Sequence, residues 1–163
     1  MCGRFTLWVD LNQLAAAFPW VQLPEGLDEL PPRYNIAPTQ PVAVVPNTGD
    51  SRLDFFVWGL IPSWAKDPAM GSRLINARSE TLAEKPSFRA AYRRRRCLIL
   101  ADGFYEWQQG PGRTRTPVYI HQPSGQPFAF AGLWELWNSP HGDEVYSCTI
   151  ITTAANEMLR PYH

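Results

Sequence analysis

Residues 41–58 have the sequence PVAVVPNTGDSRLDFFVW, in which two β-branched and aromatic runs, 41–46 and 52–58, flank the polar segment 47–50. Such runs favour strands, and a short segment that contains Asn and Gly favours a reversal of the chain between them. The sequence therefore predicts a β-hairpin over these residues.

Similar runs recur along the chain, separated by turns rich in Gly and Pro. A short alternating stretch begins at Arg4, and the later strand candidates are 97–101, 104–108, 118–121, 128–137 and 145–153. Helical patterns are few: they occur after Asp10, a candidate N-cap, at about 79–95 with a break at Pro86, and from about residue 154 onward. This pattern predicts an α+β fold, a single domain with a mostly antiparallel curled sheet or a partly closed β-barrel and a few short helices.

The composition narrows the classes of function. The chain has 163 residues, with 15 Lys and Arg against 15 Asp and Glu, so its bulk charge attracts neither a nucleic acid nor a membrane. A DNA partner would have to be met by a local patch. The odd number of cysteines, 3, does not suit a disulfide framework, and no run approaches the ~20 apolar residues of a membrane span. We therefore expect a cytoplasmic protein without a membrane partner. Because His and Cys lack ligand spacing and no nucleotide-binding loop is present, we expect no metal and no cofactor.

Cys2 is the most informative single residue, because removal of Met1 would leave it as the N-terminal residue. An N-terminal cysteine is a 1,2-aminothiol: its α-amine can attack an aldehyde to form an imine, and its thiol can then close a five-membered thiazolidine. The alternative is an ordinary residue on a frayed terminus. The adjacent Gly3 and Arg4 favour the functional interpretation, since glycine permits close approach and arginine can bind phosphate.

Three other places combine polar or aromatic groups with strand ends. Residues 76–81 resemble a strand end that runs into a helix, with Ser79 as candidate N-cap. Glu106 lies between two aromatic residues on a predicted strand, where desolvation would raise its pKa and suit acid or base work, unless it faces water on an edge strand. Trp58 and Trp64 flank a loop where an exposed ring could stack on a base, although core packing is the alternative for each. The basic run 93–96 is either a solvated helix end or part of a positive track.

Six segments together resemble, in order, motifs of the SOS response-associated peptidase (SRAP) family. They are MCGRF (1–5), RYNIAP (33–38), WGLIP (58–62), NARSET (76–81), ADGFYEW (101–107) and TTAAN (152–156). The resemblance implies a protein of the DNA damage and SOS response that recognises abasic sites in single-stranded DNA. It also implies that the domain removes Met1 by its own peptidase-like activity, and that Cys2 then crosslinks to the ring-opened sugar aldehyde as a thiazolidine.

The same resemblance assigns roles to individual positions. Asn76 would orient the reacting terminus and the sugar, Glu106 would act as acid and base, and His163 would handle the ring-opened deoxyribose in forming and reversing the crosslink, a lyase-like activity. The remaining residues are DNA contacts: Arg4 and Arg78 at phosphates, Thr152 in the pocket, Pro38 and Trp64 against neighbouring bases, and Trp58 and Ser79 beside them.

Family members usually continue past the histidine that corresponds to His163. We therefore expect one SRAP-like domain over residues 1–163, truncated at its C-terminal end, that acts as a monomer and associates with the nucleoid during DNA damage. A single-stranded DNA binding module that has lost the chemistry with its C-terminal end is the alternative function. A thiol peptidase that cleaves other substrates through Cys2 is a third.

Overall fold

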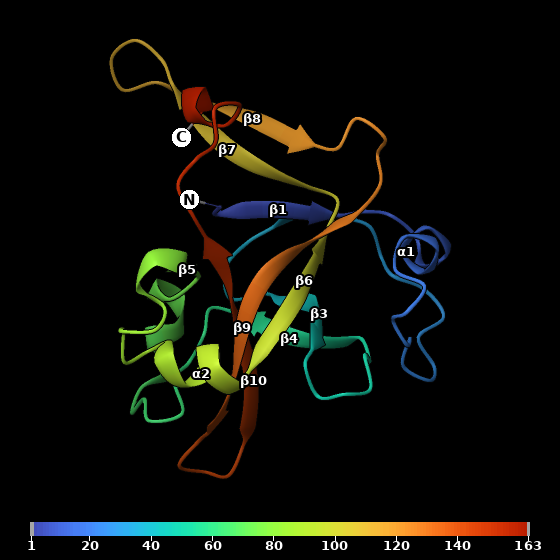
Figure 1. Cartoon of the computed structure of the whole chain (residues 1–163), viewed down its shortest axis with the longest axis vertical. Helices are drawn as coiled ribbons and strands as arrows, with labels where there is room; N and C mark the ends of the chain where they lie inside the picture. Colours follow the sequence, from blue (N-terminus) through green and yellow to red (C-terminus); the bar gives the residue numbers. More distant parts are fainter. Residues whose placement is uncertain (1, 163) are drawn as a thin grey trace.

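The computed structural model describes residues 2–162, which form two sheets and a few short helices (Figure 1). The strands are β1 (Arg4–Leu7), β2 (Arg33–Ile36), β3 (Pro41–Pro46), β4 (Asp54–Trp58), β5 (Asn76–Arg78), β6 (Arg96–Ala101), β7 (Gly103–Gln109), β8 (Arg115–His121), β9 (Phe128–Asn138) and β10 (Glu144–Thr152). The α-helices are α1 (Leu11–Ala17) and α2 (Arg89–Arg94), and the 3-10 helices are η1 (Pro68–Arg73), η2 (Ser79–Thr81) and η3 (Arg160–Tyr162).

The larger sheet has the strand order β4-β3-β6-β9-β10-β5 and curls into a five-stranded barrel. The predicted hairpin is confirmed, since β3 and β4 pair antiparallel with Val42 opposite Phe56. A short parallel pairing of β10 with β4, at Ser147 and Cys148, closes part of the barrel. Beyond it, β5 occupies the same edge of β10, from Ile150 to Thr152. The predicted partly closed barrel in a single domain is therefore confirmed.

The smaller sheet, β2-β1-β7-β8, is antiparallel and lies across one end of the barrel (Figure 1). Phe5 of β1 points into the barrel, where its ring lies 5.0 Å from that of Trp58 and 5.8 Å from that of Phe130. Asp102, buried at the corner between β6 and β7, accepts hydrogen bonds from the Thr6 hydroxyl and from the backbone N–H groups of Trp8 and Val9. This buried carboxylate fixes β1, and with it the residues that precede β1.

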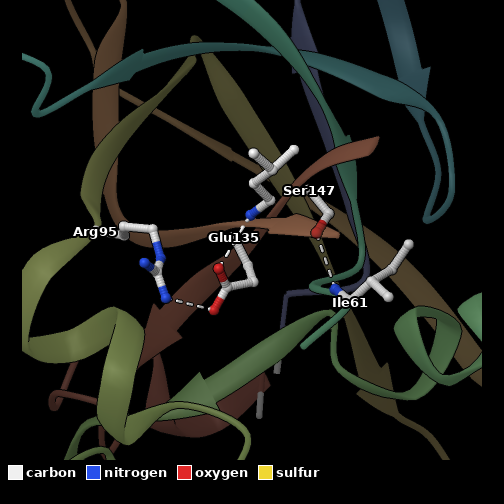
Figure 2. Close-up of polar contacts among 5 residues, drawn as sticks. Ile61, Arg95, Glu135 and Ser147 are labelled. Atoms are coloured by element: carbon white, nitrogen blue, oxygen red, sulfur yellow. Dashed lines mark hydrogen bonds and ion pairs between the residues drawn. The ribbon is translucent and has the colours of Figure 1, made fainter. Parts of the chain in front are cut away.

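The segment 59–95 covers the outer face of β9 and β10. The Ile61 N–H donates to the Ser147 hydroxyl at 2.8 Å, and Arg95 forms an ion pair with the buried Glu135 at 2.7 Å (Figure 2). Leu60 of this segment and Leu133 of β9 belong to a second cluster of buried apolar side chains. The covering segment is thus fixed to the barrel by packing and by buried polar contacts.

The predictions of helix caps and helix bounds were confirmed in part. Asp10 caps α1 and forms a capping box with Gln13, as the N-cap prediction requires. The expected helix at 79–95 is only η2 and α2, because Pro86 interrupts it, and the C-terminal helix is only the 3-10 turn η3. The N-cap prediction for Ser79 is wrong: Ser79 is the first residue of η2, and Arg78 holds the cap position without a side-chain bond.

Candidate active site

Cys2 lies just before β1 and is buried, with 6% of its surface exposed. It lines a cavity of about 240 Å³ together with Phe104 and Glu106 of β7. These two β7 residues share the face that packs against the barrel, because β1 and β7 pair with Phe5 opposite Phe104. The rest of the cavity is lined by Phe130, residues 150–156 and Leu159. Glu106 is half-buried on an inner strand, so the edge-strand alternative for it is wrong.

Asn76 reaches the same residue from the barrel side. It begins β5, directly beside Ile150 of β10, and its Nδ2 donates to the backbone carbonyl of Cys2 at 2.8 Å. Its Oδ1 is buried and accepts no hydrogen bond from the residues that the structure describes. Cys2, Asn76 and Arg73 also line a second cavity of about 370 Å³. Cys2 therefore lies between two hollows, with an amide fixing its carbonyl.

The environment of the Cys2 sulfur favours the neutral thiol. Burial, and after it the nearby Glu106 carboxylate, raises the pKa of the Cys2 thiol to about 12, from 9.0, against a smaller opposing effect of a backbone hydrogen bond at Arg4. At neutral pH the sulfur therefore keeps its proton. A proton acceptor is needed before this sulfur can form a bond, and a carboxylate lines the same cavity.

The predicted DNA contacts lie around this region at different levels of exposure. Arg4 is half-buried and its guanidinium donates to Asn35 Oδ1 at 2.8 Å. Thr152 lines the cavity beside Cys2, and Arg78 lies opposite it in the β5–β10 register. The other positions are exposed or half-buried in loops or helix ends: Pro38 after β2, Trp64 at 56% exposure, and Ser79 in η2.

Comparison with protein families matches residues 1–163 to the family described as SOS response associated peptidase (SRAP). The chain belongs to the SRAP family. It is 49% identical over 165 residues to "Abasic site processing protein YoqW" of Bacillus subtilis, covering 100% of this chain and 73% of that protein. It is 34% identical over 202 residues to "Abasic site processing protein HMCES" of Gallus gallus, covering 100% of this chain and 60% of that protein. A crystal structure of a protein from Bacteroides thetaiotaomicron is similar with a TM-score of 0.87 and 25% identity, over 99% of this chain and 72% of that chain. These findings confirm the family prediction.

Within this SRAP domain, the base-stacking prediction for Trp58 is wrong. Its side chain is fully buried, its Nε1 donates to the Ile75 carbonyl at 2.9 Å, and its ring packs edge-on against Phe5. A ring so enclosed cannot meet a base, and core packing is its role. His163, predicted as a catalytic residue, lies outside the described residues, as does Met1.

Two residues at the site could not be recognised individually from the sequence. Arg73 lines the second cavity but lies in no recognised motif, and only η1 and the close contact of Gly71 with Gly59 bring it there. Asn35 orients Arg4 from the neighbouring strand β2, whose existence the prolines before it concealed. Both depend on contacts between distant segments.

The described residues contain no group of three or more His, Cys, Asp or Glu side chains that could hold a metal ion. Among them, no helix is long and apolar enough to cross a membrane.

Proposed function

We propose that this SRAP chain processes abasic sites in DNA, and that it does so by crosslinking Cys2 to the ring-opened sugar of an abasic site in single-stranded DNA. The observation that carries the proposal is the convergence on Cys2 of two groups from distant segments. Asn76 binds its carbonyl at 2.8 Å, and Glu106 lines the same cavity as its thiol. The names of the SRAP relatives, abasic site processing proteins, indicate the same substrate.

The reaction begins with hydrolytic removal of Met1, which frees the α-amine of Cys2. The amine attacks the sugar aldehyde to form a carbinolamine, which loses water to give an imine. The thiol then adds to the imine carbon, so that a C–S bond forms and the thiol proton is transferred to the nitrogen. One aldehyde and one aminothiol thus become one thiazolidine and one water, without an oxidant or a metal.

The structure supports a division of work between the groups around Cys2. Because burial keeps the thiol protonated, the amine reacts first and the sulfur reacts second. Glu106 is placed to accept the thiol proton and return a proton to nitrogen or to the departing water. Asn76 holds the Cys2 carbonyl through its Nδ2, which leaves its buried Oδ1 as an acceptor for the α-amine. His163 would assist ring opening and reversal.

The DNA strand would enter along the polar residues that border the two cavities. Arg73 lines the second cavity, Arg4 lies two residues after Cys2, and Arg78 lies opposite Thr152. These arginines would bind the phosphates on either side of the lesion, and Thr152, which lines the first cavity, would contact the sugar. Trp64 and Pro38 would contact neighbouring bases. All of these groups come from one chain, so a monomer suffices, and we propose that it acts on DNA in the cytoplasm, at the nucleoid.

The test is a denaturing gel of the protein mixed with single-stranded DNA that carries one abasic site, beside Cys2→Ala and Cys97→Ala variants. Cys97 is a matched control, because it is also a buried free thiol but lies in β6 away from both cavities. We expect a shifted band for the wild type and for Cys97→Ala, and none for Cys2→Ala. Mass spectrometry of the purified protein should show loss of Met1.

Equal binding of the DNA by all three proteins, without any denaturant-resistant band, would refute the crosslinker. It would establish the alternative, a single-stranded DNA binding module. Cleavage of peptide substrates in trans without DNA would instead indicate a thiol peptidase.

A further inference from the structure

The smaller sheet has a second face, directed away from the barrel, that none of the proposed chemistry uses. Residues alternate between the two faces, so Phe5, Phe104 and Glu106 face the barrel and the cavity. Their neighbours face outward, and aromatic residues from these strands and the adjoining segments share that face. We call this surface the aromatic platform; it comprises Trp8, Tyr34, Tyr105, Trp107 and Tyr119.

Contacts between neighbouring residues hold three of the platform rings, those of Trp8, Tyr105 and Tyr119. The Tyr119 hydroxyl hydrogen-bonds to the Thr6 hydroxyl at 2.9 Å and accepts from Trp8 Nε1 at 3.4 Å. Its ring lies over Gly103, where a Cβ would be 2.2 Å from the Tyr119 oxygen, so only glycine leaves room for it. The Tyr105 ring lies 5.1 Å away. These contacts hold the rings without enclosing them.

The platform remains accessible in spite of this order. Tyr34 is 60% exposed, Trp8 40%, and Trp107 and Tyr119 are 37% exposed each. Trp8 and Tyr34 stack on one another at 6.4 Å with their planes 18° apart. Ordered aromatic rings that face solvent on a sheet are suited to stacking with flat ligands.

The charges on this face select the ligand. Among the described residues of β1, β2, β7 and β8, the only carboxylate is Glu106, and it faces the cavity on the opposite side. The outward positions include Arg4 at the start of β1 and Arg115, which lies opposite Gln109 at the far end of β8. The Asp102 carboxylate, which binds the Thr6 hydroxyl and the Trp8 N–H beneath the platform, is buried. An aromatic surface with arginines and no exposed carboxylate on its strands is complementary to an anion that carries flat rings.

We propose that the aromatic platform binds unpaired bases of the DNA strand beside the lesion, by stacking. The inference rests on the proposed function, because Arg4, two residues after Cys2, lies opposite Tyr105 of the platform, so that the platform continues the DNA path around the end of β1. The five residues from Arg4 to Trp8 span about 13 Å, which is enough for two or three nucleotides. The platform thereby holds the strand while Cys2 reacts.

The test measures equilibrium binding of an undamaged oligothymidine of about 15 nucleotides by fluorescence anisotropy, which needs no reaction at Cys2. The variant is Tyr34→Ala with Trp107→Ala. Tyr34 contributes only its backbone carbonyl to the bond from the Tyr105 hydroxyl, so its side chain can be removed without breaking that bond. The control is Trp20→Ala, whose ring is 47% exposed, between the values for Tyr34 and Trp107, and lies outside the smaller sheet.

We expect the double variant to bind the oligothymidine roughly tenfold more weakly for each base whose stacking side chain is removed. The affinity of Trp20→Ala should equal that of the wild type. If the double variant fails to fold, Tyr34→Ala alone carries the test. Unchanged affinity in the platform variants refutes the proposal. So does an equal loss of affinity for duplex DNA, since paired bases cannot stack on the sheet.

Two further outcomes are distinguishable. If the variants change the sedimentation of the protein but not its DNA affinity, the platform is an interface between copies and the proposal is wrong. If the wild type binds DNA through the platform but forms no Cys2-dependent adduct, the proposed crosslinking fails while the platform stands.

Discussion

The hydrogen bond from Asn76 to the Cys2 carbonyl makes a quantitative prediction about the crosslinking rate. Asn76→Ala removes both the donor, at 2.8 Å from the carbonyl, and the buried acceptor Oδ1. Asn76→Asp keeps the shape and an acceptor but places a carboxylate oxygen against the carbonyl. The two variants therefore separate the role of the donor from that of the acceptor.

The magnitude follows from the value of one partly buried hydrogen bond. Loss of a partner that leaves a buried carbonyl without a donor costs about 1–3 kcal/mol. If that cost falls on the geometry needed for reaction, about 1.4 kcal/mol lowers the rate tenfold. We expect the rate of adduct formation to fall about tenfold or more in Asn76→Ala, and further in Asn76→Asp, where repulsion replaces attraction.

The assay is single-turnover crosslinking to abasic single-stranded DNA at saturating protein, quenched at intervals and resolved on a denaturing gel. A matched control is Asn47→Ala. Asn47 accepts from Arg96 N–H at 2.9 Å and from Trp134 Nε1 at 3.1 Å, so its loss destabilises the fold without touching the site. Rates within twofold of the wild type for both Asn76 variants would refute the positioning role. An equal fall in Asn47→Ala would assign the effect to stability alone.

Three further predictions concern the fold. Gly59→Ala should lower the melting temperature by several degrees, because Gly59 has a φ of +130° and an added Cβ would lie 2.7 Å from the Gly71 carbonyl oxygen; an unchanged melting curve would contradict this. Burial raises the pKa of the Cys97 thiol to about 12, from 9.0, so the stability it contributes is complete below about pH 9 and falls as the pH rises toward 12. Between pH 8 and pH 10 the free energy of unfolding, measured in urea, should therefore fall by about 1.4 kcal/mol less in Cys97→Ala than in the wild type. Equal falls in the two proteins would count against the burial argument. Glu135→Ala should destabilise the fold by about 2 kcal/mol in the same assay, because Arg95 loses its ion-pair partner, and a Glu135→Ala curve that overlays the wild type would exclude this contribution.

The parts of the fold that sequence patterns predicted are those with a local cause. The β3–β4 hairpin follows from two apolar runs around an Asn- and Gly-containing turn, and the start of α1 follows from the capping residue Asp10. The closure of the barrel has no such cause. It depends on two residue pairs between β4 and β10, which are separated by most of the chain and whose register only the assembled sheet decides.

The candidate site also has residues that a local pattern predicts and residues that depend on contacts between distant segments. Cys2 could be singled out because its chemistry depends on its position in the sequence alone. The contact of Asn76 with Cys2 joins residues that are 74 positions apart, and it requires β5 to lie beside β10. Trp58 shows the opposite failure: a tryptophan beside a loop has the same local pattern whether its ring is exposed or buried, and only the position of Phe5 decides.

In the proposed mechanism, the burial of Cys2 would make a residue next to the chain end a selective nucleophile. A frayed terminus would expose the thiol, and its amine would react with any aldehyde. Here Asp102 fixes β1, Asn76 fixes the Cys2 carbonyl, and burial raises the thiol pKa to about 12, so the sulfur is held in place and unreactive until a proton acceptor acts on it. In the proposed reaction, selectivity for an abasic site would follow from access, because an aldehyde must enter the cavity that Glu106 lines before it can react with Cys2.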